Sequence, residues 1–316
     1  MNAIATFSTP NTKNIGLLTG TEWEATQVRE LFQLAASIKA HPDRYRGTMA
    51  GRNLALIFEK PSLRTRVTFE IGMASLGGAS VFLDHTVTRL GQRESVPDVA
   101  RSLGRWVHGI VARTFQQESI DELAEHSGVP VINALSDRFH PCQALTDFFT
   151  LEEHLGSLRG VKVAYLGDGN NVCHSLLSVG ARVGAHLRVA TPAGYGPASS
   201  VIAEARRAAK STGARIEILC SPEDAVAGAQ AVYTDVWTSM GQEQESAERA
   251  AVFAPYQVNE ALMDHAAPGA VFLHCLPAHR GAEVSAEVIE SQRSIVFDQA
   301  ENRLHVQKAV LLNVLG

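Results

Sequence analysis

The 316-residue chain has few cysteines, no surplus of basic charge and no Cys-x-x-Cys pair. Its four cysteines are widely spaced, which argues against a disulfide framework or a structural zinc site and favours a reducing compartment. Lys and Arg total 28 against 33 acidic residues, so the net charge is −5. This balance predicts neither a nucleic acid nor a membrane as partner, and any affinity for anions must be local.

Long hydrophobic runs are also missing. No apolar stretch approaches the ~18 residues that a membrane-spanning helix needs, and the first twenty residues lack the layout of a signal peptide. We therefore expect a soluble, cytoplasmic protein. Because 45% of the residues are hydrophobic, the chain can form one large or two ordinary domains with buried cores.

From residue 50 onward, short β-rich runs alternate with longer amphipathic stretches, a pattern typical of βα units that build mostly parallel sheets. The ten predicted strands are too many for one comfortable sheet. They cover residues 53–58, 79–83, 109–112, 129–134, 161–166, 186–191, 215–219, 229–234, 270–274 and 294–297.

Helices are predicted at both ends of the chain and at its middle. Thr21 opens the first one, with Glu24 completing a capping box before an apolar stripe. A second helix spans 143–154, and a final apolar helix spans 302–315. Because glycines interrupt the pattern just after residue 154, we place a domain boundary near residue 150. The fold class is α/β, with mostly parallel sheets flanked by helices.

Residues 59–70, EKPSLRTRVTFE, form a predicted turn between a strand and a helix. The hydroxyls of Ser62 and Thr65 converge there with free backbone N–H groups, and Arg64 adds a guanidinium, so the turn can hold a phosphate dianion. A capped helix with solvated arginines is the alternative for so short a motif.

Two further motifs follow predicted strands. Arg113 comes after the strand at 109–112, and His140-Pro141-Cys142-Gln143 comes after the strand at 129–134. Open α/β sheets bind ligands at the carboxyl ends of their strands. Three such motifs together favour an anion site over an isolated loop histidine or an arginine paired with a neighbouring acid.

In the second half, Gly167-Asp168-Gly169-Asn170-Asn171 links a strand to a helix and superficially suggests a dinucleotide-binding turn. The third glycine is missing, and no acid that could bind a ribose closes the next strand. A nucleotide-dependent oxidoreductase is therefore disfavoured. Asn171 could bind an amino-acid head group or simply cap the helix.

Two more strands end in polar motifs. Asp235 begins the segment DVWTSMGQE and supplies a negative charge for an ammonium group, while the following Ser-Met-Gly predicts a mobile loop. The run HCLPAHRG follows an apolar strand. Zinc bound by His274, Cys275 and His279 is conceivable, but alternation along the strand would point the first two to opposite faces, so we predict no metal.

Taken together, these motifs resemble the aspartate/ornithine carbamoyltransferase family from the phosphate turn to Arg303. Ser62-Leu63-Arg64-Thr65-Arg66 resembles its carbamoyl phosphate signature S-x-R-T-R, and His140-Pro141-x-Gln143 resembles its second signature. Asp235, the Ser-Met-Gly loop and His-Cys-Leu-Pro are similar to the ornithine branch. Leu63 is a departure, because ornithine enzymes usually have Thr or Met there.

The resemblance implies direct transfer of a carbamoyl group from carbamoyl phosphate to the δ-amine of L-ornithine, giving L-citrulline and phosphate without a metal or organic cofactor. The implied catalytic residues are Arg113, His140, Asp235 and Cys275. Carbamoyl phosphate would be bound by Ser62, Leu63, Arg64, Thr65, Arg113, His140, Gln143, Cys275, Leu276 and Arg303. Ornithine would be bound by Asn171, Asp235, Ser239 and Met240.

The resemblance also implies two domains with the active site in the cleft between them, and a homotrimer. Residues 1–150, joined by the terminal helix at 302–316, would bind carbamoyl phosphate, and residues 151–301 would bind ornithine. Cys275 would position the substrate rather than act as a nucleophile, and a neighbouring cation would be the cause of any shift in its pKa. The alternatives are a transcarbamylase for a modified ornithine or a diamine, and a non-catalytic binding relative.

Overall fold

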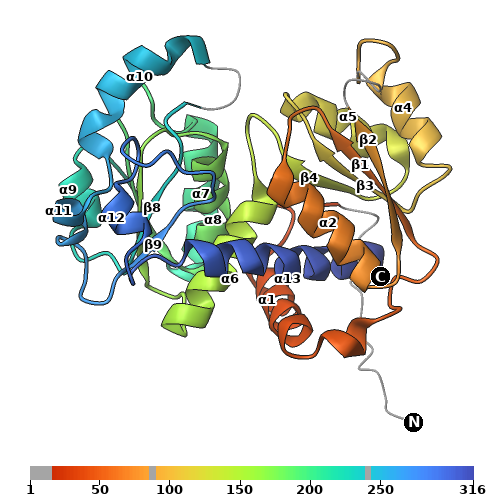
Figure 1. Ribbon diagram of the computed structural model, residues 1–316, viewed down its shortest axis with the longest axis horizontal. Helices are drawn as coiled ribbons and strands as arrows, with labels where there is room; N and C mark the ends of the chain where they lie inside the picture. Colours follow the sequence, from red (N-terminus) through yellow and green to blue (C-terminus); the bar gives the residue numbers. More distant parts are fainter. Residues whose placement is uncertain (1–15, 85–89, 239–242) are drawn as a thin grey trace.

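The structure, a computed structural model, describes residues 16–84, 90–238 and 243–316. Two parallel sheets, each flanked by helices, lie side by side (Figure 1). The first has the strand order β2-β1-β3-β4 and the second β7-β6-β5-β8-β9, so the α/β fold class is confirmed. The strands are β1 (Asn53–Phe58), β2 (Ala79–Asp84), β3 (Gly109–Arg113), β4 (Val131–Leu135), β5 (Lys162–Leu166), β6 (His186–Ala190), β7 (Ile216–Leu219), β8 (Ala231–Thr234) and β9 (Val271–Leu273).

The helices include one long terminal helix and several short ones around the second sheet. They are α1 (Ala25–Ala40), α2 (Leu63–Ser75), α4 (Val96–Leu103), α5 (Gln117–Ser127), α6 (Pro141–Leu155), α7 (Asn171–Val183), α8 (Ser199–Thr212), α9 (Pro222–Val226), α10 (Ser246–Phe253), α11 (Glu260–Met263), α12 (Ala286–Ile289) and α13 (Val296–Leu315), with short 3-10 turns at Pro42–Tyr45, Glu243–Glu245 and Ala254–Tyr256. Within the described ranges, no helix combines the length and apolar character needed to cross a membrane.

The central strands β1 and β3 of the first sheet are buried on both faces because they are apolar at consecutive positions. Leu54 and Leu56 of β1 join a core with α1 and α13, whereas Ala55 and Ile57 join a separate core with α4 and α5. Successive side chains of a strand point to opposite faces, so a continuous apolar run requires helices on both sides. Parallel pairing then places the carboxyl ends of all four strands at one edge.

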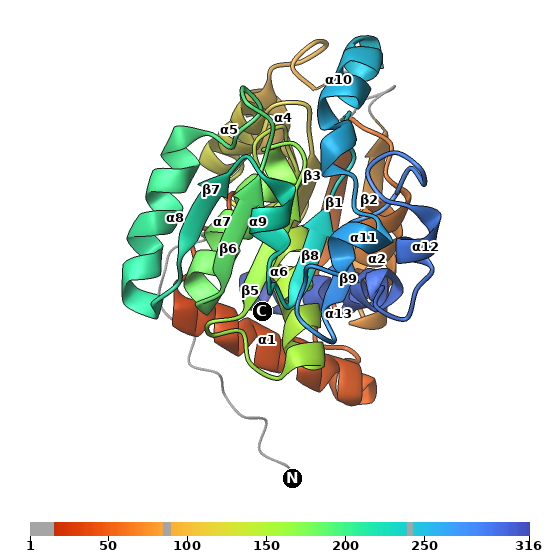
Figure 2. The same ribbon diagram turned by 90° about the vertical axis from the view of Figure 1, so that its left-hand side faces the viewer.

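Helix α13 carries the chain from the second sheet back to the first. It packs against α1, α2 and α6, along one side of the molecule (Figures 1 and 2). Its buried residues Arg303, Val306 and Val310 recur at helical spacing. Helix α6 runs unbroken through residue 150, and the domain boundary near that residue stays a prediction.

Two sequence-based expectations are wrong. No strand forms at 294–297: Ser294 makes a single bridge to Phe272, and α13 begins at Val296, six residues before the predicted start at 302. The first helix begins after Glu24, whose N–H donates to Gln27 Oε1 (2.8 Å), whereas the Thr21 hydroxyl bonds to Thr19. Glu24 rather than Thr21 is therefore the N-cap, and Gln27 rather than Glu24 completes the capping box. The other predicted strands, and the helix at 143–154, end within two residues of those observed.

Candidate active site

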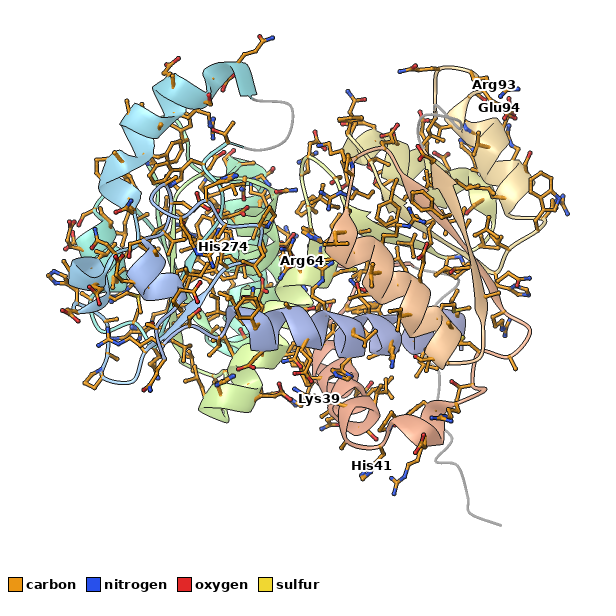
Figure 3. All side chains as sticks on the ribbon, in the orientation of Figure 1. Lys39, His41, Arg64, Arg93, Glu94 and His274 are labelled. Atoms are coloured by element: carbon orange, nitrogen blue, oxygen red, sulfur yellow. The ribbon has the colours of Figure 1, made fainter. Side chains whose placement is uncertain are left out.

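A cleft of about 1060 Å³ lies between the two halves of the molecule, at the carboxyl ends of the strands. Figure 3 places Arg64, at the start of α2, beside the space between the two halves. Twelve of the predicted site residues line this cleft: Ser62, Leu63, Arg64, Thr65, Arg113, His140, Gln143, Asn171, Asp235, Cys275, Leu276 and Arg303. Ser239 and Met240 lie outside the described residues.

Two helices begin at the cleft without a side-chain cap. Ser62 precedes α2 and His140 precedes α6, and neither side chain accepts a hydrogen bond from its own helix. The first N–H groups of a helix have no partner within it, and the helix dipole makes that end favourable for anions. The Ser62 turn can therefore offer backbone N–H groups, a hydroxyl and Arg64 to one phosphate.

Arg303, near the C-terminal end of the chain, joins the Ser62–Thr65 turn to the start of α6. Its Nη2 donates to Thr65 Oγ1 (2.9 Å), and its Nη1 donates to Gln143 Oε1. The Arg303 side chain is almost fully buried. One guanidinium thus fixes the relative positions of α2, α6 and α13 at the cleft.

Burial controls the charge state of the groups around Arg303. Burial, followed by repulsion from Arg303, lowers the pKa of Arg113 to about 10. The pKa of His140 is held well below its ordinary value, first by burial and then by Arg303 and Arg113. His140 is therefore neutral at pH 7. Among the described residues, Arg113 Nε and His140 Nδ1 are buried without a hydrogen-bond partner, so both retain bonding capacity.

On the opposite side of the cleft, Asp235 is held by two neighbours. Asn170 Nδ2 donates to Asp235 Oδ2 (2.8 Å), and Cys275 Sγ donates to Asp235 Oδ1 (3.0 Å). The Asp235 side chain follows β8 and the Cys275 side chain follows β9, which pairs with β8. The arrangement fixes one carboxylate where a ligand ammonium group could approach.

The expected cause of a shifted Cys275 pKa is wrong. Burial, followed by the negative charge of Asp235, raises the pKa of this thiol well above its ordinary value, and the opposing effect of Arg303 is smaller. Cys275 is therefore a neutral thiol at pH 7. A neutral thiol is a poor nucleophile, so the environment agrees with a positioning role.

The capping role that the sequence left open for Asn171 belongs to its neighbour. Asn170 Oδ1 accepts from the N–H groups of Val172 and Cys173, whereas Asn171 Nδ2 donates to the carbonyl of Ser136 (2.6 Å). Asn171 is the first residue of α7, and its side chain reaches the loop after β4. It still lines the cleft.

His274 and Cys275 do not point to opposite faces, contrary to the sequence-based expectation. Strand β9 ends at Leu273, and ligand atoms of Asp235, His274 and Cys275 lie within 4.8 Å of one another. Both ring nitrogens of His274 already have partners, however. Nδ1 accepts from the Leu276 N–H (2.9 Å), and Nε2 lies 3.2 Å from Glu283 Oε1. Metal binding would break one of these contacts.

The interpretation of the sequence missed an ion pair on the side of the cleft that holds Asp235. Arg249 of α10 pairs with Asp168 of the Gly167–Asn171 turn, and its Nε donates to the carbonyl of Trp237 (2.6 Å). Its guanidinium also lies over the rings of Tyr195 and Phe253. Asp168 was part of a recognised motif, but no local pattern indicated its partner 81 residues away.

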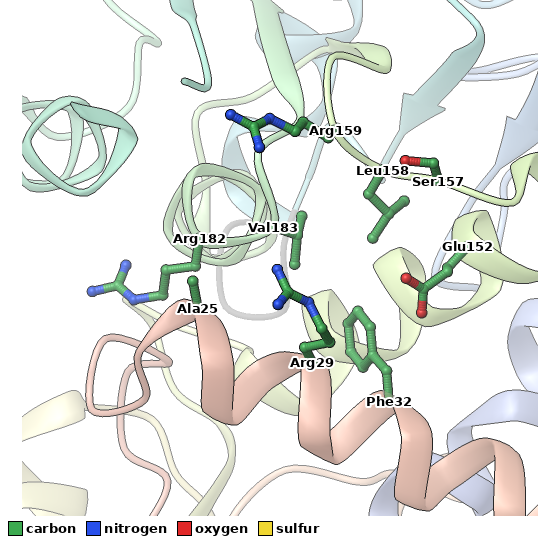
Figure 4. A pocket seen from close by; sticks show the side chains of 9 residues that line it. All are labelled: Ala25, Arg29, Phe32, Glu152, Ser157, Leu158, Arg159, Arg182 and Val183. Carbon is green, nitrogen blue, oxygen red and sulfur yellow. The ribbon is translucent and has the colours of Figure 1, made fainter. Parts of the chain in front are cut away.

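A separate pocket of about 110 Å³ lies between α1, α6 and α7 (Figure 4). Its lining includes Arg29, Glu152 and Arg182, and none of the predicted site residues. Arg182 is already occupied, because its Nη2 pairs with Glu204. The predicted chemistry therefore belongs to the large cleft alone.

Comparison with known proteins decides the family. Residues 16–153 match the model for the carbamoyl-P binding domain of aspartate/ornithine carbamoyltransferase, and residues 159–314 match the model for its Asp/Orn binding domain. The chain belongs to the aspartate/ornithine carbamoyltransferase family. The cleft of this carbamoyltransferase lies between the two matched segments, and both segments contribute residues to it.

Individual members of the family are similar to this carbamoyltransferase over nearly its whole length. Ornithine carbamoyltransferase of Anoxybacillus flavithermus is 48% identical, with 100% of both chains covered. An anabolic ornithine carbamoyltransferase of Pyrococcus furiosus is 49% identical over 93% of this chain and 92% of its own. A solved structure of ornithine carbamoyltransferase from Pyrococcus furiosus superposes with a TM-score of 0.93 at 47% identity, covering 96% of this chain and 97% of the other.

Proposed function

We propose that this chain is an ornithine carbamoyltransferase, which transfers the carbamoyl group of carbamoyl phosphate to the δ-amine of L-ornithine and releases L-citrulline and phosphate. The observation that carries the proposal is the division of the cleft into two sides. Buried guanidinium groups and uncapped helix starts lie on one side, and the Asp235 carboxylate lies on the other. The names of full-length relatives support the same activity.

The positive side binds carbamoyl phosphate. Ser62, Leu63, Arg64 and Thr65 hold the phosphate through backbone N–H groups, hydroxyls and one guanidinium, joined by Arg113. Gln143 Oε1 accepts from the carbamoyl nitrogen, because the Gln143 amide N–H groups face Asp147. Arg303 supports this geometry through its bonds to Thr65 and Gln143.

Arg113 and His140 polarise the carbonyl oxygen of the carbamoyl group, together with the Thr65 hydroxyl. The neutral imidazole of His140 donates a hydrogen bond without adding a third positive charge beside Arg113 and Arg303. Donors that are already in place stabilise the oxyanion of the tetrahedral intermediate, and the loss of one typically lowers the rate by ~10²–10³.

The negative side binds ornithine. Asp235 attracts its α-ammonium group, Asn171 bonds to its head group, and Ser239 and Met240 also bind it. Cys275 and the Leu276 carbonyl lie beside the attacking δ-amine. An alkyl amine has a pKa of ~10.4, so the reactive neutral form is scarce at pH 7 and activity rises with pH.

We further propose a homotrimer in the cytoplasm that serves arginine biosynthesis. An apolar stripe on α2 supports the assembly: Leu63, Val67 and Ile71 recur at a spacing of four residues and remain exposed. These residues begin at the phosphate turn, so a second copy seated on them would lie beside the cleft. We also assign residues 1–150 with the terminal helix to carbamoyl phosphate binding, and residues 151–301 to ornithine binding.

Formation of the carbamoylated product by the purified protein, which is citrulline when the amine is L-ornithine, tests the activity. Carbamoyl phosphate is supplied with L-ornithine, acetylornithine, succinylornithine, putrescine or L-aspartate in parallel. Turnover with L-ornithine and not with the other amines is expected. Turnover with another amine alone would overturn the acceptor assignment, and carbamoyl phosphate binding without any turnover would indicate a non-catalytic relative.

A further inference from the structure

Asp147 lies at the centre of a buried polar network between the two sides of the cleft. Its side chain belongs to α6, is fully buried and does not line the cleft itself. Asp147 Oδ1 accepts from Gln143 Nε2 (2.7 Å) on its own helix and from Gln299 Nε2 (2.6 Å) on α13. Within the described part of the chain, Oδ2 has no hydrogen-bond partner.

The carboxylate decides which way both glutamine amides face. An ionised carboxylate only accepts hydrogen bonds, so each amide must turn its nitrogen toward Asp147 and its oxygen away. For Gln143, the oxygen then faces Arg303 on the donor side of the cleft. For Gln299, the oxygen accepts from the His274 N–H (3.1 Å), immediately before Cys275 and Leu276.

We infer that Asp147 is a positioning residue for both substrates: one oxygen orients Gln143 toward carbamoyl phosphate and, through Gln299, fixes the chain that carries Cys275 and Leu276. The inference rests on the proposed function. It assigns no contact between Asp147 and substrate. Hydrogen bonds shared within a buried network hold the bonded side chains in one arrangement, and this precision is what a two-substrate site requires.

Three titratable groups face Asp147 from the elements packed around it. They are Tyr233 from β8, Arg303 from α13 and Cys275 after β9. Burial raises the pKa of Asp147 to about 7 despite the opposing effect of the hydrogen bonds from Gln143 and Gln299. Oδ1 can keep both amide bonds in either protonation state, so the acceptor geometry, rather than the charge, carries the positioning role.

Two substitutions separate geometry from charge. Asp147→Asn keeps an oxygen that can accept from both glutamines, and Asp147→Leu removes it. Thr146→Val is the matched control, because the Thr146 side chain is equally buried on the same helix and, among the described residues, its hydroxyl bonds only to the carbonyl of Cys142. The measurements are kcat, KM for L-ornithine and carbamoyl phosphate affinity by calorimetry, at pH 6 to 9.

Asp147→Leu should lower kcat/KM at least tenfold and weaken the binding of both substrates. The kcat/KM values of Asp147→Asn at pH 8 and of Thr146→Val should stay within about threefold of the wild-type value. Any contribution of Asp147 to the pH profile near pH 7 should disappear in Asp147→Asn. The inference is overturned if Asp147→Leu retains wild-type kinetics, or if Asn or the Val control loses as much as Leu.

Gln299→Met supplies a second test that does not require Asp147→Leu to fold. It removes the bond to His274 but leaves the Gln143–Asp147 pair, so KM for L-ornithine should rise at least threefold more than the Kd for carbamoyl phosphate. Equal changes would contradict the inference. A wild-type protein that binds carbamoyl phosphate but makes no citrulline would contradict the proposed function alone, and calorimetry of the variants would still decide the role of Asp147.

Discussion

The substitution Arg249→Met removes the ion pair that links the turn after β5 to the segment after β8. In the folded protein, Arg249 is almost fully buried, pairs with Asp168 and donates to the carbonyl of Trp237. Methionine keeps part of the apolar contact with Tyr195 and Phe253 but leaves the half-buried Asp168 carboxylate without its cation.

The expected loss is about 3 kcal/mol of unfolding free energy, near the lower end for breaking a buried ion pair because the Asp168 side chain retains 14% of its exposure. Burial already raises the pKa of Asp168, and Arg249 opposes that effect. Without Arg249 the pKa rises further, and ionisation of an unpaired carboxylate becomes costly. The destabilisation should therefore grow as pH increases from about 4 toward neutrality.

Urea unfolding at pH 5 and pH 8 measures this loss, with Arg280→Met as the control. Arg280 and Glu290 form an exposed pair, with 47% and 61% of their side chains accessible, so the control should change stability by about 0.5 kcal/mol at most. KM for L-ornithine should rise about tenfold in Arg249→Met because the Trp237 backbone loses its donor, while carbamoyl phosphate affinity is retained. Equal destabilisation by the two variants, or an equal loss of affinity for both substrates in Arg249→Met, would refute the reasoning.

Three further outcomes follow from the geometry. Arg64→Ala should weaken carbamoyl phosphate binding more than ornithine binding, by about tenfold or more, and Cys275→Ala should do the reverse. Steady-state kinetics that show equal losses of affinity for both substrates in both variants would contradict this division. Asp147→Asn should gain up to about 4 kcal/mol of stability relative to the wild type as pH rises from 4 to 8. The reason is that a native pKa of about 7 for Asp147 makes the wild type lose stability over that range. Urea unfolding that shows the same difference in unfolding free energy at every pH would exclude this. Gly169→Ala should lower kcat/KM for ornithine more than tenfold, since its Cβ would lie 2.2 Å from the backbone nitrogen of Pro197; unchanged kinetics and an unchanged melting temperature would show that the turn tolerates the shift.

The donor half of the cleft was predictable because its residues follow strands of one sheet. The Ser62–Thr65 turn, Arg113 and His140 each come within a few residues of a strand end, and parallel strands bring those ends to one edge. The sequence also indicated Asp235 and Cys275 by the same rule. Local pattern and sheet topology were sufficient for these residues because each lies close in sequence to the end of a strand.

The network around Asp147 was not predictable in this way. Gln143 and Asp147 are four residues apart on a predicted helix, so their contact could have been proposed from spacing. Gln299, however, lies between the strand predicted at 294–297 and the helix predicted from 302, so the sequence assigned it to no element, whereas the structure places it in α13. A contact over 152 residues depends on how α13 crosses α6, and periodicity within either segment carries no information about that crossing.

The charges of the cleft are also a consequence of burial rather than of composition. A protein with a net charge of −5 places Arg113 and Arg303 at the base of the cleft, where burial lowers the pKa of each guanidinium and makes a third cation costly. His140 beside them is consequently neutral, and in the proposed function it is a hydrogen-bond donor to the carbonyl rather than a third cation for the phosphate. Across the cleft, the same burial keeps the Cys275 thiol neutral, so Asp235 presents a single negative charge. In the proposed reaction, a dianionic donor and an ammonium-bearing acceptor are thus drawn to opposite sides, and the neutral groups between them are left to act on the carbamoyl group and the attacking amine.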